Sequence, residues 1–166
     1  MATQNSFDIT TGVDLQEVDN AVNQALKEIG QRYDFKGTHN SIELDRSKGV
    51  LRLEADDEYR MKALYDVLQS RLVKRGVPLK NLRPGKLDDA ALGRVRQTVD
   101  LMQGIPADTA RAIARAIKDR KMKNVQVAIQ GDQLRVSSPS KDALQQVIQF
   151  LRSQDFGVEL RFGNYR

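Results

Sequence analysis

Arginine and lysine are the residues of this sequence with the clearest capacity for binding chemistry, and they concentrate in one segment. Residues 93–135 carry nine basic and four acidic side chains, so their net charge of +5 equals that of the whole 166-residue chain. Arg94 and Arg96 have the alternate spacing of residues on one face of a strand. Arg135 lies in another predicted strand and points to the face opposite to Leu134 and Val136. Guanidinium and ammonium groups form charge-assisted hydrogen bonds with anions. The segment therefore predicts a nucleotide, a nucleic acid or an acidic protein as partner.

Other cations of the same segment follow a helical spacing. Arg111, Arg115 and Lys118 fall on one face of a predicted helix. A solvated surface also explains cations on a helix, whereas a sheet fixes the side chains of its strands. We therefore assign the ligand contacts to the strand arginines and to the lysines of RKMK at 120–123, with the turn after the strand meeting the base. The predicted nucleotide-binding residues are Arg94, Arg96, Lys121, Lys123, Gln130, Gly131 and Arg135, with Arg32 and Lys36 as second-tier candidates.

Residues suited to catalysis are scarce. The sequence has no Cys and a single His, His39, which excludes disulfides, thiolate metal sites and a multi-histidine metal site. It contains no GxxxxGK[ST] phosphate loop, no GxGxxG fingerprint and no GxSxG elbow. We therefore predict a protein that is not an enzyme, with no catalytic residue, no metal site and no cofactor.

Hydrophobic periodicity indicates the elements that position these residues. Asp14 precedes a helix whose apolar face runs from Leu15 to Ile29, and a second helix follows the acidic residues 56–58. Between them, residues 41–53 alternate around an SKG turn and predict a β-hairpin. VPLKNL at 77–82 is a candidate strand, RPGKLDDA at 83–90 is a candidate linker, and GVELRFGNYR at 157–166 is the candidate last strand.

The second half of the chain repeats the first. FDITTGVD at 7–14 aligns with VDLMQGIP at 99–106, and RGVPLK at 75–80 aligns with FGVELR at 156–161. The repeat indicates a duplicated βαββαβ unit, which forms a four-stranded antiparallel sheet with two helices on one face. The predicted fold class is therefore α+β. The central strands of the second unit contain no aromatic residue, which disfavours RNA recognition by base stacking on the sheet. The nearest aromatic residues are Tyr33 and Phe35, and Phe162 and Tyr165 near the end of the chain.

Several segments of the sequence resemble those of the YajQ-like nucleotide-binding proteins, a bacterial and cytosolic family. They are FDI, RYDFKG, IEL, KRGV, IKDRKMKNVQVAIQGDQLRV and LRFGNYR, in this order over nearly the whole chain. The resemblance implies two ferredoxin-like domains that exchange their first strands. The first domain would be residues 12–103, and the second would be residues 1–11 with 104–166. SSPSKDALQ after the RV strand and the ending NYR depart from the family pattern.

The resemblance also implies a function. Family members are described as nucleotide binders, and some as cyclic di-GMP effectors that contact a transcription regulator. We predict a non-enzymatic protein that binds cyclic di-GMP or a related nucleotide. An RNA- or DNA-binding module and an interaction adaptor for a transcription regulator are the alternatives. No apolar run reaches the roughly 18 residues of a membrane span, and the N-terminus does not resemble a signal peptide, so we expect a cytoplasmic protein without membrane contacts.

Overall fold

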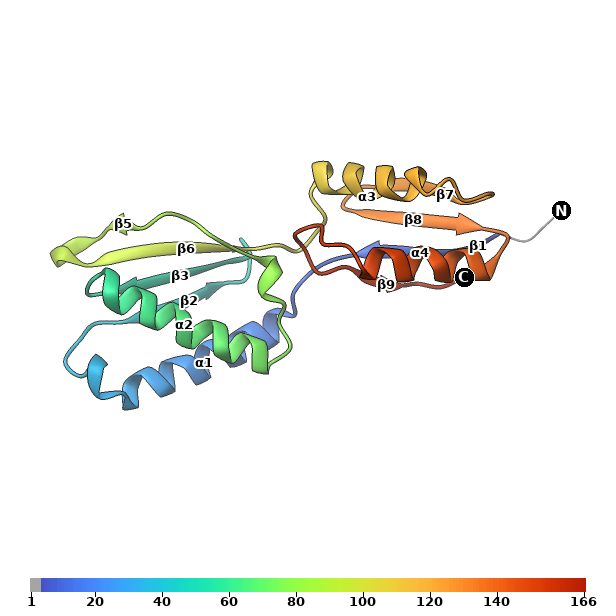
Figure 1. Cartoon of the computed structure of the whole chain (residues 1–166). Helices are drawn as coiled ribbons and strands as arrows, with labels where there is room; N and C mark the ends of the chain where they lie inside the picture. Colours follow the sequence, from blue (N-terminus) through green and yellow to red (C-terminus); the bar gives the residue numbers. More distant parts are fainter. Residues whose placement is uncertain (1–3) are drawn as a thin grey trace. The chain divides into compact units, whose positions relative to one another are not determined.

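Two antiparallel sheets, each covered on one face by two helices, form the chain (Figure 1). The computed structural model describes residues 4–166, so residues 1–3 of the predicted second domain lie outside the described residues. The chain divides into two units: Val13–Met102, and Gln103–Arg166 together with the first strand. None of the described helices is long and apolar enough to cross a bilayer.

The unit formed by Val13–Met102 contains α1 and α2 on one face of its sheet. Asp14 begins α1, because its carboxylate accepts hydrogen bonds from the backbone N–H groups of Gln16 and Glu17, as expected for an N-cap. The order of paired strands is β2-β3-β6-β4, and β5 also pairs with β6. The elements are α1 (Leu15–Gln31), β2 (Ser41–Asp45), β3 (Val50–Ala55), α2 (Glu58–Lys74), β4 (Leu82–Pro84), β5 (Asp88–Asp89) and β6 (Val95–Leu101).

The other unit has the same arrangement, with α3 and α4 on one face of its sheet. The order of its paired strands is β7-β8-β1-β9. Its elements are β1 (Asn5–Thr10), α3 (Ala107–Asp119), β7 (Gln126–Gln130), β8 (Gln133–Ser138), α4 (Lys141–Arg152) and β9 (Arg161–Gly163). Apolar residues of α3 and α4 pack on Phe7, Ile9, Leu134 and Val136 of the sheet, which form its buried face.

The first strand of each ferredoxin-like unit comes from the other half of the chain. β1 pairs with β8 and β9, although the chain enters α1 directly after β1. In the same way β6 pairs with β3 and β4, although α3 follows β6. Both sheets therefore have the ferredoxin-like order, in which the first strand lies between the third and fourth. The predicted α+β fold, with exchanged first strands, is confirmed.

Three local predictions were inaccurate. Residues 77–82 do not form a strand, because Leu79–Asn81 fold as a 3-10 turn in which the buried Asn81 side chain donates to the Met102 carbonyl. Strand β4 begins only at Leu82, and the predicted linker contributes β5. The last strand is limited to Arg161–Gly163, because Asn164 adopts a left-handed backbone conformation with φ of 52°.

Candidate functional site

Arg135 lies at the centre of the open face of its sheet, and its charge is neutralised there. Its Nε donates to Asp8 Oδ1 at 2.9 Å, across a strand pair that places Asp8 directly opposite. Asn164 Nδ2 also donates to the Asp8 carboxylate, at 2.6 Å. The hydrogen bond from Arg135 holds the pKa of Asp8 below its usual value despite burial, and the same bond raises the pKa of Arg135. A ligand phosphate at Arg135 would therefore compete with Asp8.

Arg94 and Arg96 belong to the other unit and have different surroundings. Arg94 precedes β6, with its Nε 3.6 Å from Asp56 Oδ1. Arg96 is exposed on the open face of the sheet, opposite Glu54 of β3 and Asp88 of β5 in the strand register. It lines a shallow depression of about 170 Å³ that also contains Arg52 and the carboxylates of Glu43 and Glu54. The mixture of charges gives this face little net attraction for phosphate.

The predicted contacts around β7 lie at its two ends. Lys121 and Lys123 are exposed in the connection that enters the strand, whereas Gln130 and Gly131 lie where it ends. The five residues of β7 span roughly 14 Å, and the lysines lie beyond its first residue. Gly131 opens the two-residue turn to β8 with φ of 66°, a conformation that glycine adopts without strain. The lysines and the turn therefore do not form one small-ligand site.

Arg32 and Lys36 flank the 3-10 turn Tyr33–Phe35 in the other unit. Arg32 binds Asp34 through two hydrogen bonds, of 3.0 and 2.7 Å, and its guanidinium lies 5.4 Å from the centre of the Phe35 ring. Lys36 is exposed. The nine predicted residues are thus distributed over both units, and the structure does not bring them together as one site.

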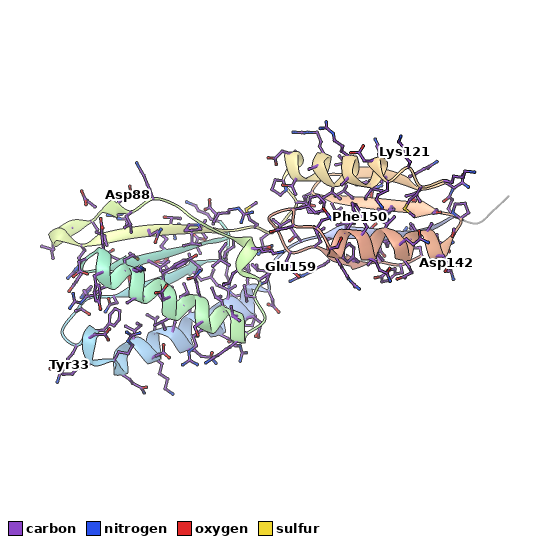
Figure 2. All side chains as sticks on the ribbon, in the orientation of Figure 1. Tyr33, Asp88, Lys121, Asp142, Phe150 and Glu159 are labelled. Atoms are coloured by element: carbon purple, nitrogen blue, oxygen red, sulfur yellow. The ribbon has the colours of Figure 1, made fainter. Side chains whose placement is uncertain are left out.

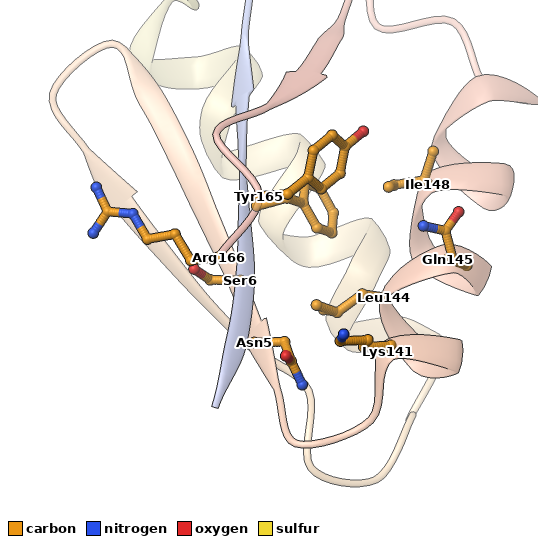
Figure 3. A pocket seen from close by; sticks show the side chains of 9 residues that line it. Asn5, Ser6, Lys141, Leu144, Gln145, Ile148, Tyr165 and Arg166 are labelled. Atoms are coloured by element: carbon orange, nitrogen blue, oxygen red, sulfur yellow. The ribbon is translucent and has the colours of Figure 1, made fainter. Parts of the chain in front are cut away.

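A pocket of about 410 Å³ lies at the edge of β1, between the C-terminal tail and α4 (Figure 3). We call it the tail pocket. Its volume is within the range of small-ligand sites. It is lined by Asn5, Ser6, Phe7, Lys141, Leu144, Gln145, Ile148, Tyr165 and Arg166.

Backbone pairing positions the tail beside the pocket. The N–H of Ser6 donates to the Arg166 carbonyl at 3.2 Å, and the N–H of Arg166 donates to the Ser6 carbonyl at 3.0 Å. Asn5 fixes the opposite wall, because its amide donates to the Pro139 carbonyl at 3.1 Å, just before α4 begins. Tyr165 therefore lies opposite Leu144 and Ile148 across the pocket (Figure 3).

The tail pocket combines apolar and cationic groups. Buried Phe7, Leu144 and Ile148 supply its apolar surface, and the Tyr165 ring lies 6.4 Å from the Phe7 ring, centre to centre. The Tyr165 side chain remains 60% exposed, so its ring is available for a further contact. Lys141 is an exposed cation at the rim and forms no ion pair with another described residue. The guanidinium of Arg166 points away from the pocket, to the other side of β1 (Figure 3). Such a site can hold a flat aromatic ring together with an anionic group.

Sequence reasoning missed the tail pocket. Tyr165 was noted only as an aromatic residue outside the central strands, and Lys141 lies in a segment with little net charge. The remaining signal was Lys141 at the start of α4, but its position across the pocket from Tyr165 depends on pairing between β1 and the tail. Among the described residues no three His, Asp or Glu side chains are grouped as metal ligands would be.

Comparison with known proteins gives a consistent result over the full length. The sequence profile of the family described as "Nucleotide-binding protein YajQ-like" matches residues 5–166. A protein of Carboxydothermus hydrogenoformans named "Nucleotide-binding protein" is 53% identical over 166 residues, which is all of both chains. "Nucleotide-binding protein Acid345_2028" of Koribacter versatilis is 49% identical over 162 residues, covering 98% of this chain and 97% of that protein.

Proposed function

Because the chain belongs to the YajQ-like family of nucleotide-binding proteins, we propose that it binds a nucleotide in the tail pocket and acts as an effector rather than as an enzyme. The pocket carries this proposal, because an exposed aromatic ring, an apolar wall and the unpaired cation of Lys141 meet in about 410 Å³. The relatives are named nucleotide-binding proteins, which supports a nucleotide as the ligand.

The base of the nucleotide enters between Tyr165 and the apolar side chains of α4. Stacking on an aromatic ring contributes roughly 1–3 kcal/mol per base and tolerates different bases. Lys141 is the first residue of α4, so a phosphate beside it also lies near the positive end of the helix dipole. Asn5 and Gln145 supply amide groups for the edge of the base.

Cyclic di-GMP is our first choice of ligand. One guanylate half of it fits a pocket of this size, with the second half outside in solvent. The absence of a phosphate loop, of Cys and of a second His from the sequence supports binding without turnover.

Isothermal titration calorimetry with cyclic di-GMP, GMP, GTP and AMP tests this proposal. Tyr165→Ala should weaken binding about tenfold, from the loss of stacking, and Lys141→Ala should weaken it by a similar factor. Tyr33→Ala and Lys27→Ala are the matched controls, since both residues are exposed in the other unit. They should leave affinity within about twofold.

The nine residues predicted from sequence remain a competing location for the ligand. Arg96→Ala belongs in the same series, because Arg96 is exposed and forms no ion pair with another described residue. Loss of affinity in Arg96→Ala with unchanged binding in Tyr165→Ala would place the ligand on the sheet. Failure of all four nucleotides to bind the wild-type protein would refute nucleotide binding by this chain.

A further inference from the structure

Strand β7 has a free edge. It pairs with β8 on one side, and no described strand pairs with it on the other. Gln130 and Gln133 flank the two-residue turn and so exchange both backbone hydrogen bonds, as do the alternate pairs before them. The backbone N–H and C=O groups of Val127 and Ile129 therefore point away from β8, toward the free edge. Such an edge is a template for one more strand.

A row of cations lies on α3, the helix that packs against β7. Arg111, Arg115 and Lys118 are exposed, and none of them forms an ion pair with another described residue. The orientation of the row follows from Arg120, whose guanidinium lies 4.6 Å from the centre of the Phe150 ring on α4. Arg120 is nine residues after Arg111, half a turn around the helix, so the row faces away from α4. Figure 2 labels Lys121, which follows the end of α3, and Phe150 of α4.

The position of the row decides which partner suits the edge. α4 covers β8 and β1, so the side of α3 away from α4 is the outer side, where β7 ends the sheet. A second copy of this chain pairing through its own β7 would bring an identical row of cations to the junction. Cations beside an open edge oppose such self-association. An acidic strand instead gains from the same charges.

We propose that β7 accepts an extended acidic segment of another protein as an added strand. Backbone hydrogen bonds to Val127 and Ile129 hold the segment, and acidic side chains at alternate positions reach the row on α3. Alternate residues of a strand are roughly 7 Å apart, and Arg111 and Arg115 are about 6 Å apart along the helix axis. Two or three acidic side chains therefore match the row.

The observations favour a protein segment over a nucleic acid. The free edge presents N–H and C=O groups in alternation, which only another peptide backbone satisfies along its length. β7 itself contains no aromatic side chain on which a base could stack. The added strand uses a surface different from the tail pocket, so nucleotide binding and strand addition can succeed or fail separately.

Fluorescence anisotropy with a nine-residue peptide of alternating glutamate and valine tests the proposal. Ile129→Pro should weaken binding at least about tenfold, because it removes an outward N–H while leaving the bonds to β8 intact. The double variant Arg111→Gln with Arg115→Gln should weaken binding about fivefold, since exposed ion pairs are individually weak. Lys27→Gln with Lys74→Gln changes the net charge equally in the other unit and should have less than a twofold effect.

A second peptide keeps the test independent of how the variants fold. The same sequence with N-methyl groups on alternate backbone amides retains every charge but cannot pair as a strand, so it should bind wild-type protein at least about tenfold more weakly. Equal binding of the two peptides would overturn strand addition. So would binding of duplex RNA that depends on Arg111 and Arg115 but not on Ile129→Pro, or self-association of the protein that Ile129→Pro abolishes.

Discussion

At the scale of single residues, the ion pair of Asp8 and Arg135 joins two strands that are distant in sequence and makes the stability of the fold depend on pH. Arg135 lowers the pKa of Asp8 in the folded protein, so the unfolded chain binds more protons as the pH falls. The stabilisation is complete above the ordinary carboxyl pKa of about 4 and is lost as the pH falls through the lower folded value.

We expect Asp8→Asn to lower the free energy of unfolding by about 2 kcal/mol at neutral pH, in the range of a charged hydrogen bond. The loss should shrink below about pH 4, because the wild-type carboxyl then gains a proton in the unfolded chain, and at still lower pH in the folded protein as well. Urea denaturation between pH 3 and pH 7 measures both effects. Asp142→Asn, an exposed residue of α4, is the control. A loss that stays constant over this pH range would contradict the argument.

This pair also shows what residue patterns can and cannot reveal. Alternation with Leu134 and Val136 correctly placed Arg135 on the open face of the sheet. Its partner is 127 residues away, and only the register between β1 and β8 brings the two together. Local sequence fixes the face of a side chain, but a contact across strands depends on non-local pairing. The availability of Arg135 for a ligand could therefore not be judged from sequence.

At the scale of elements, the two halves share a glycine where the exchanged strand leaves its sheet. Gly12 follows β1 and Gly104 follows β6, as the internal alignment predicted. A Cβ on Gly104 would lie 2.3 Å from Asp132 Oδ2 and 2.7 Å from its Cβ, at the turn between β7 and β8. The next residue, Ile105, donates its N–H to the Asp132 carbonyl at 2.9 Å. This close approach leaves no room for a side chain.

Gly104→Ala should therefore destabilise the protein by about 1–3 kcal/mol, because the turn must move. Gly30→Ala is the matched substitution, since a Cβ there meets nothing within 4 Å and the residue lies in α1. It should stabilise the protein by about 0.5–1 kcal/mol through helix propensity. Thermal unfolding followed by circular dichroism compares the two. Similar shifts in the same direction would show that the contact with Asp132 does not constrain the loop.

The elements themselves were predictable where the pattern is long. The helices follow from apolar spacing and from caps such as Asp14, because burial of one face requires that period. The short strands and the turns were not predictable from such a pattern. Buried Asn81 donates to the Met102 carbonyl, and Asn164 adopts a left-handed backbone conformation and donates to the Asp8 carboxylate. The tail pocket depends on the conformation of Asn164, which explains why its residues escaped prediction.

At the scale of the whole molecule, the exchange of first strands makes chain order differ from spatial order. Phe7 is fully buried among residues of the unit that contains Gln103–Arg166, although the chain next enters α1. Val99 is fully buried in the other unit, although α3 follows it. We propose that the folding units are residues 12–103, and residues 1–11 with 104–166. A substitution in an exchanged first strand then destabilises elements that are distant in sequence rather than the elements next to it in the chain.

Phe7→Ala and Val99→Ala test this division by hydrogen exchange of the full chain. Truncation of a buried Phe costs about 3–5 kcal/mol, so Phe7→Ala should raise exchange in β8 and α4, more than 120 residues away, and much less in α1, which begins five residues after β1. Val99→Ala removes less volume and should act on β3 and α2 rather than on α3. If Phe7→Ala instead raised exchange mainly in α1, stability would follow neighbours in sequence. The distant pairing of β1 would then contribute little, and the proposed units would be wrong.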